Sequence, residues 1–232
     1  MIYLFCLGVF NMVGYWNYTV WLTYISTLLA VLGVSFCLIN PAHAEDYAVL
    51  CLLVCGGLDM FDGKVARTKK DRTEFEKDNG IQIDSLSDLL AFGILPATIA
   101  IRLFLNAEAN TKSFSFILVI AVALFYVLFG LVRLGYFNAL EHERSKTDDS
   151  VLKYYTGMPI TMAAFFMPIA YLFKFTNMSN MAFAWLYFAS LAVLGLLFVL
   201  KIKVPKAGKK MIIAFSIFGF VFLISFLLLK FM

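Results

Sequence analysis

The chain has 232 residues, of which 62% are hydrophobic and only 15% are charged, and its formal net charge is +4. This apolar content, which includes 25 Phe, far exceeds what a soluble domain of this length needs for one core, and it excludes that class. The apolar runs are continuous, whereas the strands of a membrane β-barrel alternate. We therefore expect an all-α fold, a polytopic integral membrane helical bundle.

Seven apolar runs follow one another along the chain, and each can form a helix that crosses about 30 Å of hydrocarbon. They cover residues 18–40, 47–66, 83–105, 114–138, 155–174, 181–200 and 211–231. We expect six core helices and a C-terminal seventh. Accordingly, residues 1–17 form an N-terminal interfacial segment, residues 18–200 the transmembrane domain, and residues 201–232 a basic loop with the last helix. Residues 1–17 lack the Lys or Arg of a secretory signal.

Positive charge is concentrated in alternate loops between these runs. The loops after the second, fourth and sixth runs hold thirteen Lys and Arg residues, whereas the intervening loops hold Lys112 alone. Loops that are rich in Lys and Arg stay on the cytoplasmic side of a membrane. The charge pattern therefore predicts that these three loops face the cytoplasm.

Four aspartates lie at the ends of two neighbouring apolar runs, in the stretch LDMFDGKVARTKKDRTEFEKDNGIQIDSLSDLLAFG (58–93). They are Asp59, Asp62, Asp84 and Asp88. The other acidic residues, including Glu45 and Asp46, fall in predicted loops. An aspartate inside a span costs on the order of 2.5–3.5 kcal/mol during insertion, so such residues usually line a polar cavity and have a function.

Their spacing predicts that the four carboxylates meet. Residues three or four positions apart share one face of a helix, so Asp59 lies beside Asp62, and Asp84 beside Asp88. Both pairs flank one predicted loop, and an antiparallel hairpin would bring them together at the inner membrane surface. All-oxygen ligation suits Mg²⁺ or Mn²⁺ rather than zinc. Two such ions bridged by carboxylates stabilise displacement at a phosphoryl group.

Three interpretations of these aspartates are open on chemistry alone. Carboxylates at helix ends are usually a solvated face in soluble proteins, but the cost of burial in a membrane argues against that interpretation here. An ion transporter also uses intramembrane carboxylates, although they would be strung across the bilayer. For phosphoryl transfer, Gly63 and Ala66 would let a nucleotide approach the helix, and Arg67 would supply a fork-shaped donor for phosphate oxygens.

The same stretch reads Asp59-x2-Asp62-Gly63-x2-Ala66-Arg67, then Gly80-x3-Asp84-x3-Asp88. This pattern closely resembles the signature of the CDP-alcohol phosphotransferase family. These integral membrane enzymes join an alcohol to the phosphoryl group of a CDP-linked partner and release CMP. The resemblance implies two divalent ions, Mg or Mn, held by the four aspartates. It also implies that Asp88 is the general base that takes the proton from the attacking hydroxyl.

The resemblance further implies a CDP site lined by Gly63, Ala66 and Arg67. Polar positions that the family has at the start of its first core helix correspond here to Thr23. Between the two halves of the pattern lie twelve residues, TKKDRTEFEKDN, where many members have about eight. We expect this charged stretch to be a solvated loop, and Thr73 within it to contact the nucleotide.

Three further segments resemble the membrane-embedded bacterial phosphatidylserine synthases, a branch of this family. They are SLSDLLAFGILPA (85–97), LVRLGYFN (131–138) and YYTGMPITMAA (154–164). The likeness implies CDP-diacylglycerol as donor, L-serine as acceptor and CMP as the leaving product. Arg133 lies in an apolar run and would pair with the serine carboxylate or a substrate phosphate, with Asn138 nearby. The alternative for Arg133 is snorkelling to the cytoplasmic surface.

The acceptor remains open within the family. Glycerol 3-phosphate or inositol phosphate would favour several basic residues near the active site, where Arg133, Lys153 and the charged stretch are the candidates. The resemblance also implies a homodimer in the bacterial cytoplasmic membrane, with its active site facing the cytoplasm and no nucleic-acid partner.

Overall fold

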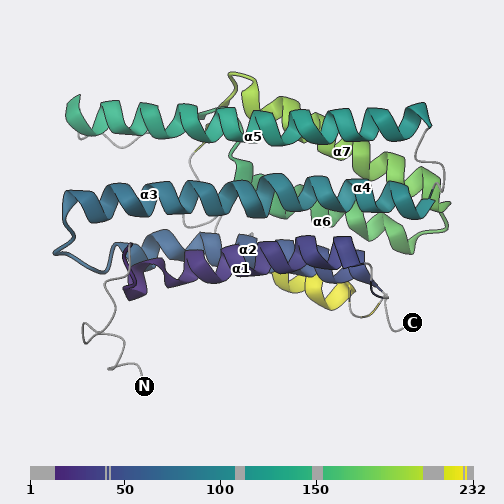
Figure 1. Ribbon diagram of the computed structural model, residues 1–232, viewed down its shortest axis with the longest axis horizontal. Coiled ribbons are helices and arrows are strands. Elements are labelled where there is room, and N and C mark those ends of the chain that lie inside the picture. The colour runs from purple at the N-terminus through teal and green to yellow at the C-terminus, as the bar shows by residue number, and fades with distance from the viewer. Residues whose placement is uncertain are drawn as a thin grey trace.

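The computed structural model describes residues 14–39, 41, 43–107, 113–147, 154–205, 217–226 and 228, and its helices lie side by side and nearly parallel (Figure 1). The longer helices are α1 (Trp21–Ile39), α2 (Ala44–Ala66), α3 (Glu74–Asp88), α4 (Leu95–Ala107), α5 (Phe114–Thr147), α6 (Ala163–Leu172) and α7 (Asn180–Val199). The short elements are η1 (Tyr18–Val20), η2 (Leu89–Ile94), η3 (Ile160–Met162), η4 (Phe173–Phe175), β1 (Tyr154–Thr156) and β2 (Lys203–Pro205).

The prediction of a polytopic membrane bundle is confirmed. Within the described part of the chain, four helices are long and apolar enough to cross a membrane, namely Tyr18–Ile39, Glu74–Ala107, Phe114–Glu143 and Asn180–Val199. Two shorter apolar helices cover Ile160–Phe175 and Ile217–Phe226. Helix α2 is long enough as well, but the charged residues near both of its ends set it apart from these four helices. The predicted interfacial segment falls largely on residues 1–13, which lie outside the described part of the chain.

The helix formed by α3, η2 and α4 passes between α1 and α2 on one side and α5 on the other (Figure 1). It starts at Glu74, so the expectation that the whole charged stretch of residues 68–79 forms a loop is wrong. A capping box explains this early start, because Thr73 and Glu76 satisfy backbone groups of the first turn. Helix α5 likewise continues to Thr147 instead of ending near residue 138. Hydropathy places the ends of apolar runs, whereas capping and helix propensity place the ends of helices.

The predicted span at 155–174 is interrupted at its start. β1 pairs with β2 in antiparallel register, with Tyr155 opposite Val204. Gly157 then adopts a φ of 81°, and its N–H donates to the carbonyl of Ile202 at 2.8 Å. The left-handed backbone conformation favours glycine and cannot continue a helix. Helix α6 therefore begins only at Ala163, after the short turn η3.

Close packing brings α2 against α6. A methyl group built on Gly56 would lie 2.4 Å from Cβ of Ala164, so only glycine fits at this contact. The neighbouring Gly57 has no atom within 4 Å of its own Cβ position, apart from its surrounding helix. Gly56 therefore fixes the distance between the two helices one turn before Asp59.

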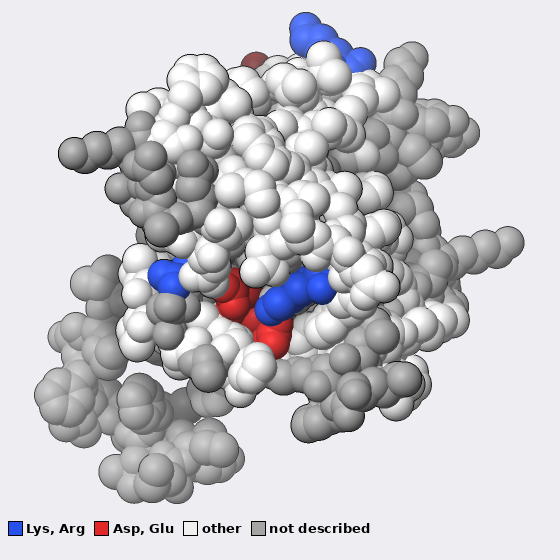
Figure 2. All heavy atoms as spheres, turned by 90° about the vertical axis from the view of Figure 1, so that its right-hand side faces the viewer, with Lys and Arg blue, Asp and Glu red and all other residues white. Residues whose placement is uncertain are grey.

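Buried charged residues connect the start of α2 to the rest of the bundle. Figure 2 shows this end of the molecule, where acidic and basic side chains gather in a hollow among uncharged atoms. Asp46 is 2% exposed and accepts hydrogen bonds from the Tyr171 hydroxyl at 2.5 Å and from Lys174 Nζ at 2.8 Å. Asn106 donates to the buried Glu45. The assignment of Glu45 and Asp46 to a predicted loop is therefore wrong. Both acids lie in the first turn of α2, where the helix dipole favours them.

Candidate active site

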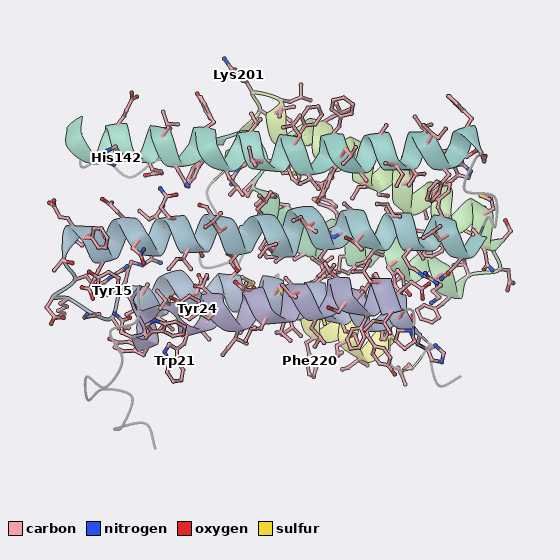
Figure 3. All side chains as sticks on the ribbon, viewed as in Figure 1. Tyr15, Trp21, Tyr24, His142, Lys201 and Phe220 are labelled. Atoms are coloured by element: carbon pink, nitrogen blue, oxygen red, sulfur yellow. The ribbon has the colours of Figure 1, made fainter. Side chains whose placement is uncertain are left out.

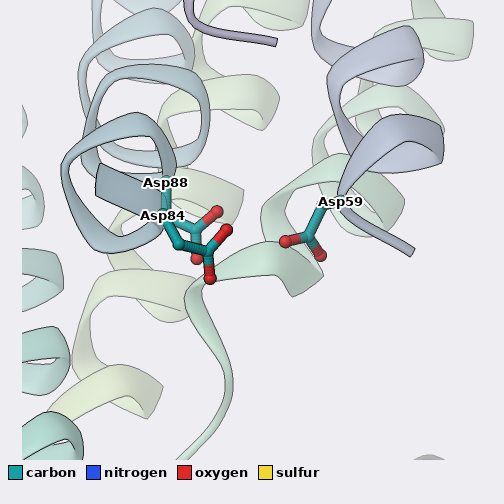
Figure 4. Close-up of side chains that lie close together, drawn as sticks. All are labelled: Asp59, Asp84 and Asp88. Carbon is teal, nitrogen blue, oxygen red and sulfur yellow. The ribbon is translucent and has the colours of Figure 1, made fainter. Parts of the chain in front are cut away.

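The four aspartates of the sequence pattern lie on two neighbouring helices. Asp59 and Asp62 project from the last turns of α2, and Asp84 and Asp88 from the last turns of α3. Figure 4 shows Asp59 pointing across the gap toward Asp84 and Asp88. Oxygen atoms from these three carboxylates all lie within 4.8 Å of one another. The helical spacing and the hairpin thus bring side chains from both halves of the pattern to one place.

Asp62 joins this cluster from the side. It is 8% exposed, its carboxyl group contacts that of Asp84, and it accepts a hydrogen bond from the Thr23 hydroxyl at 3.3 Å. Asp59 makes the corresponding contact with Asp88. The four carboxyl groups therefore form two pairs, and each pair bridges α2 and α3.

These carboxylates suit a hard divalent cation. Oxygen ligands bind such ions at about 2.0–2.6 Å, so ligand atoms around one ion lie no more than roughly 5 Å apart. The 4.8 Å limit for Asp59, Asp84 and Asp88 meets that requirement. Like charges at this distance repel strongly unless positive charge lies among them. Arg133 acts electrostatically on both Asp59 and Asp88, but one guanidinium balances only one of the four acids.

The helix widens directly after Asp88. Residues Leu89–Ile94 form a π-helical turn, a rare conformation that occurs often at functional sites. Pro96 lacks the N–H group that would pair with the carbonyl of Phe92 in a regular α-helix. The buried Tyr126 hydroxyl of α5 donates to that carbonyl instead, at 2.7 Å. The widened turn is thus fastened to α5 at a point one turn after Asp88.

Hydroxyl groups fasten the same region to α1. Thr27 Oγ1 lies 3.0 Å from Ser87 Oγ and 2.9 Å from the carbonyl oxygen of Thr23. The Ser87 hydroxyl is within 3.3 Å of that same carbonyl oxygen, and Ser87 is only 3% exposed. Sequence reasoning did not identify Ser87 or Thr27. The available signal was the one-turn spacing of Thr23 and Thr27 on an apolar helix.

A pocket of about 320 Å³ opens beside the carboxylates. Six residues that the sequence predicts for the site line it, namely Thr23, Asp62, Gly63, Ala66, Arg67 and Asp84. Gly80 of the pattern lines it too, together with Thr19, Arg72 and Lys77, for which the sequence predicted no role. The Arg67 guanidinium lies over Gly63, 3.8 Å from where a Cβ would be. The absence of a side chain at Gly63 therefore keeps this wall of the pocket open.

Aromatic side chains surround the start of α1 at this end of the bundle. Trp16 and Trp21 are about half exposed, and Trp16 packs against Tyr24 with ring centroids 5.3 Å apart. Figure 3 shows Trp21 pointing outward from α1 and Tyr15 lying near Tyr24. Trp and Tyr collect at the boundary between lipid and water. The pocket includes residues at the start of this helix, so these aromatic side chains lie at the same end of the bundle as the pocket.

The profile of the CDP-alcohol phosphatidyltransferase family matches residues 16–196, a stretch that contains the whole site. The chain belongs to the CDP-alcohol phosphatidyltransferase family. Members of this family generally depend on a divalent metal, and the carboxylate cluster of this member could hold one. The family resemblance inferred from the aspartate pattern is thereby confirmed.

Curated relatives of this family member have related names. A CDP-diacylglycerol–serine O-phosphatidyltransferase of Helicobacter pylori is 30% identical over 172 residues, which are 72% of this chain and 65% of that protein. A protein of the same name from Methanocaldococcus jannaschii is 31% identical over 198 residues, which cover 85% of this chain and 76% of that protein. An archaetidylserine synthase of Methanothermobacter thermautotrophicus is 31% identical over 159 residues, which cover 68% of this chain and 60% of that protein. The match thus spans less than two thirds of the Helicobacter relative.

Five predicted site residues of this family member lie outside the lining of the pocket, namely Asp59 and Asp88 of the carboxylate cluster and Thr73, Arg133 and Asn138. Thr73 is the N-cap of α3, where its hydroxyl accepts from the N–H of Glu76 at 3.1 Å. Arg133 lies on α5 with its guanidinium 4.9 Å from the centre of the Phe137 ring. Asn138, farther along α5, donates to the Ser85 hydroxyl at 2.7 Å. Arg133 and Asn138 thus approach the aspartates from the side of α5, opposite to α1.

Proposed function

We propose that the protein is a phosphatidylserine synthase, which transfers the phosphatidyl group of CDP-diacylglycerol to the hydroxyl of L-serine and releases CMP. The observation that carries this proposal is the meeting of Asp59, Asp84 and Asp88 within 4.8 Å, beside a pocket that Arg67 lines. Membership of the family supports the reaction class. The names of the three relatives support serine as the acceptor, because each name contains serine, although one of them names a different lipid product.

Two divalent ions, Mg²⁺ or Mn²⁺, would be held by Asp59, Asp62, Asp84 and Asp88. When bound, they neutralise the charge on the diphosphate and on the leaving phosphate. The pairing of carboxyl groups across α2 and α3 supports this ligand set, because each pair offers oxygen atoms from both helices. The Thr23 hydroxyl would fix the orientation of Asp62.

Asp88 is the general base in this proposal. It takes the proton from the serine hydroxyl, whose oxygen then forms a bond to the phosphorus that carries diacylglycerol. The bond from that phosphorus to the bridging oxygen of the diphosphate breaks, and CMP leaves with this oxygen. The hydrogen bonds of Ser87 on one side and of Phe92 on the other support a fixed position for the Asp88 carboxyl group.

Gly63, Ala66, Arg67 and Thr23 would bind the CDP part of the donor. Their place in the lining of the pocket supports these roles, since a nucleotide can approach α2 where no large side chain intervenes. The Arg67 fork would bind phosphate oxygens. Thr73 remains a prediction, because a contact with nucleotide would have to replace its hydrogen bond to Glu76.

The acceptor would lie on the side of α5. There the Arg133 guanidinium would pair with the carboxylate of L-serine, and the Asn138 amide would donate to the same group. The electrostatic contact of Arg133 with Asp59 and Asp88 supports a position close to the reacting hydroxyl. In this arrangement the carboxylate of serine would pair with Arg133 while its hydroxyl lies close to Asp88, the general base.

The surroundings of the site belong to the same proposal. We place the catalytic unit in residues 18–200, in the cytoplasmic membrane of a bacterium, with the pocket facing the cytoplasm and two protomers forming a homodimer. The excess of Lys and Arg in the loops on the side of the pocket supports this orientation. The position of the aromatic residues around Trp21 supports a site that lipid and water-soluble substrates can both reach.

The test is the choice of acceptor. Purified protein in detergent receives CDP-diacylglycerol and Mn²⁺ with L-serine, glycerol 3-phosphate or inositol phosphate, and the release of CMP is measured. We expect CMP release with L-serine and not with glycerol 3-phosphate or inositol phosphate. Release with one of the other acceptors would retain the metal site and refute the serine assignment. If folded protein released no CMP with any acceptor, the proposed reaction would be wrong.

A further inference from the structure

Two cations of the charged stretch between the halves of the aspartate pattern line the pocket. Arg72 and Lys77 line it together with Arg67, so three basic side chains contribute to the lining of this pocket. Asp62 and Asp84 line the pocket as well. The proposed catalytic residues account for Arg67 and the two acids, but they give no role to Arg72 or Lys77.

Arg72 is held in a fixed position at the rim. Its Nη1 donates to the carbonyl of Ala66 at 3.4 Å, and its Nη2 donates to the carbonyl of Glu76 at 3.3 Å. A Cβ on Gly80 would lie only 2.8 Å from Nη2, so this glycine of the pattern leaves the space that the guanidinium fills. A guanidinium has five N–H donors, and these two bonds use two of them. Because Arg72 also lines the pocket, the guanidinium retains further donors for an anion there.

The segment that carries Lys77 is fastened through Glu76. The Glu76 carboxylate accepts from Lys69 Nζ at 2.7 Å, from the Asn17 amide at 3.3 Å and from the Thr73 N–H at 3.0 Å. The hydrogen bond with Glu76 raises the pKa of Lys69 above its ordinary value. The Glu76 carboxylate is therefore occupied by Lys69, Asn17 and Thr73. Lys77, one residue later, lines the pocket.

We propose that Arg72 and Lys77 bind the diphosphate of the nucleotide donor, so that the long charged stretch is part of the nucleotide site. Three cations in one pocket suit a ligand that carries several anionic oxygens, and they suit a ligand with a single carboxylate or a neutral sugar less well. Asp62 and Asp84, which would hold a divalent ion, line the same pocket, so a diphosphate bound there would lie beside the carboxylates. This inference rests on the proposed function and adds to it the binding role of a segment that the aspartate pattern omits.

Nucleotide binding to the purified full-length protein in detergent with Mg²⁺ tests the inference. The probes are CDP, CMP and uncharged cytidine, and affinity is measured by titration calorimetry for wild type, Lys77→Gln and Arg72→Gln. Lys70→Gln is the matched control, because Lys70 is an exposed cation of the same stretch outside the lining of the pocket. Thermal unfolding without nucleotide shows whether each variant retains the stability of wild type.

We expect Lys77→Gln and Arg72→Gln to bind CDP about tenfold more weakly, since each loses a charge-assisted hydrogen bond. The loss should be smaller for CMP and absent for cytidine and for the Lys70→Gln control. Added salt should weaken CDP binding of wild type more than that of Lys77→Gln. Unchanged CDP affinity in either variant, at wild-type stability, would overturn the inference for that residue. A wild-type protein that binds no CDP would instead refute the proposed function.

Discussion

The contact between α2 and α6 at Gly56 gives a quantitative prediction for stability. Carbon atoms in contact lie about 3.5–4.0 Å apart, whereas a Cβ at Gly56 would lie 2.4 Å from Cβ of Ala164. In Gly56→Ala the two helices must therefore move apart by roughly 1 Å or more. Overpacking of this kind costs about 1–3 kcal/mol, and the better helix propensity of alanine offsets up to ~1 kcal/mol. We expect a net loss of about 1–2 kcal/mol.

The adjacent glycine provides the control. A Cβ on Gly57 meets no atom within 4 Å, so Gly57→Ala should be as stable as wild type or slightly more stable. Thermal unfolding of the three proteins in one detergent compares them. Gly56→Ala should also lose activity, because Asp59 follows three residues later on the displaced helix. If both variants had the same midpoint and full activity, the packing of α2 on α6 described above would be refuted.

Further predictions concern the site itself. Asp88→Asn should lower the rate of CMP release by at least about 100-fold and largely spare CDP binding, because the other three aspartates would still hold metal, whereas Asp59→Asn should weaken Mn²⁺ and CDP binding together. Removal of divalent metal with a chelator should abolish CMP release, and excess Mg²⁺ or Mn²⁺ should restore it; activity that survived chelation would contradict a metal site on the aspartates. Tyr126→Phe leaves the carbonyl of Phe92 without its partner and should cost about 1–3 kcal/mol of stability, and an unchanged unfolding midpoint would show that this bond does not hold the widened turn.

The apolar runs and the aspartates were readable in the sequence because both follow from helical geometry. Runs of about 20 apolar residues mark spans, and offsets of three or four residues predict which carboxylates share a face. The start of α3 was misplaced because hydropathy cannot distinguish a charged helix from a charged loop. The sequence did contain the relevant signal, since Thr73 and Glu76 have the spacing of a capping box.

Other features depend on contacts between distant residues and have no local signal. Asp46 is buried because Lys174 and Tyr171, more than 120 residues later, supply its partners. The pairing of Tyr126 with the Phe92 carbonyl similarly requires α5 to pack against the widened turn. The approach of Arg72 to Gly80 depends on how the charged stretch folds back on α3. Each of these requires the tertiary arrangement, which hydrophobic periodicity alone does not specify.

The central claim concerns the bond that serine forms, and the fate of the serine oxygen tests it most directly. The purified protein is incubated with CDP-diacylglycerol, Mn²⁺ and L-serine labelled with oxygen-18 at its hydroxyl, and the products are identified by mass spectrometry. We expect labelled phosphatidylserine and unlabelled CMP in equal amounts, because the serine oxygen attacks the phosphorus that carries diacylglycerol. A labelled cytidine monophosphate ester of serine, or the absence of phosphatidylserine, would contradict the proposed reaction.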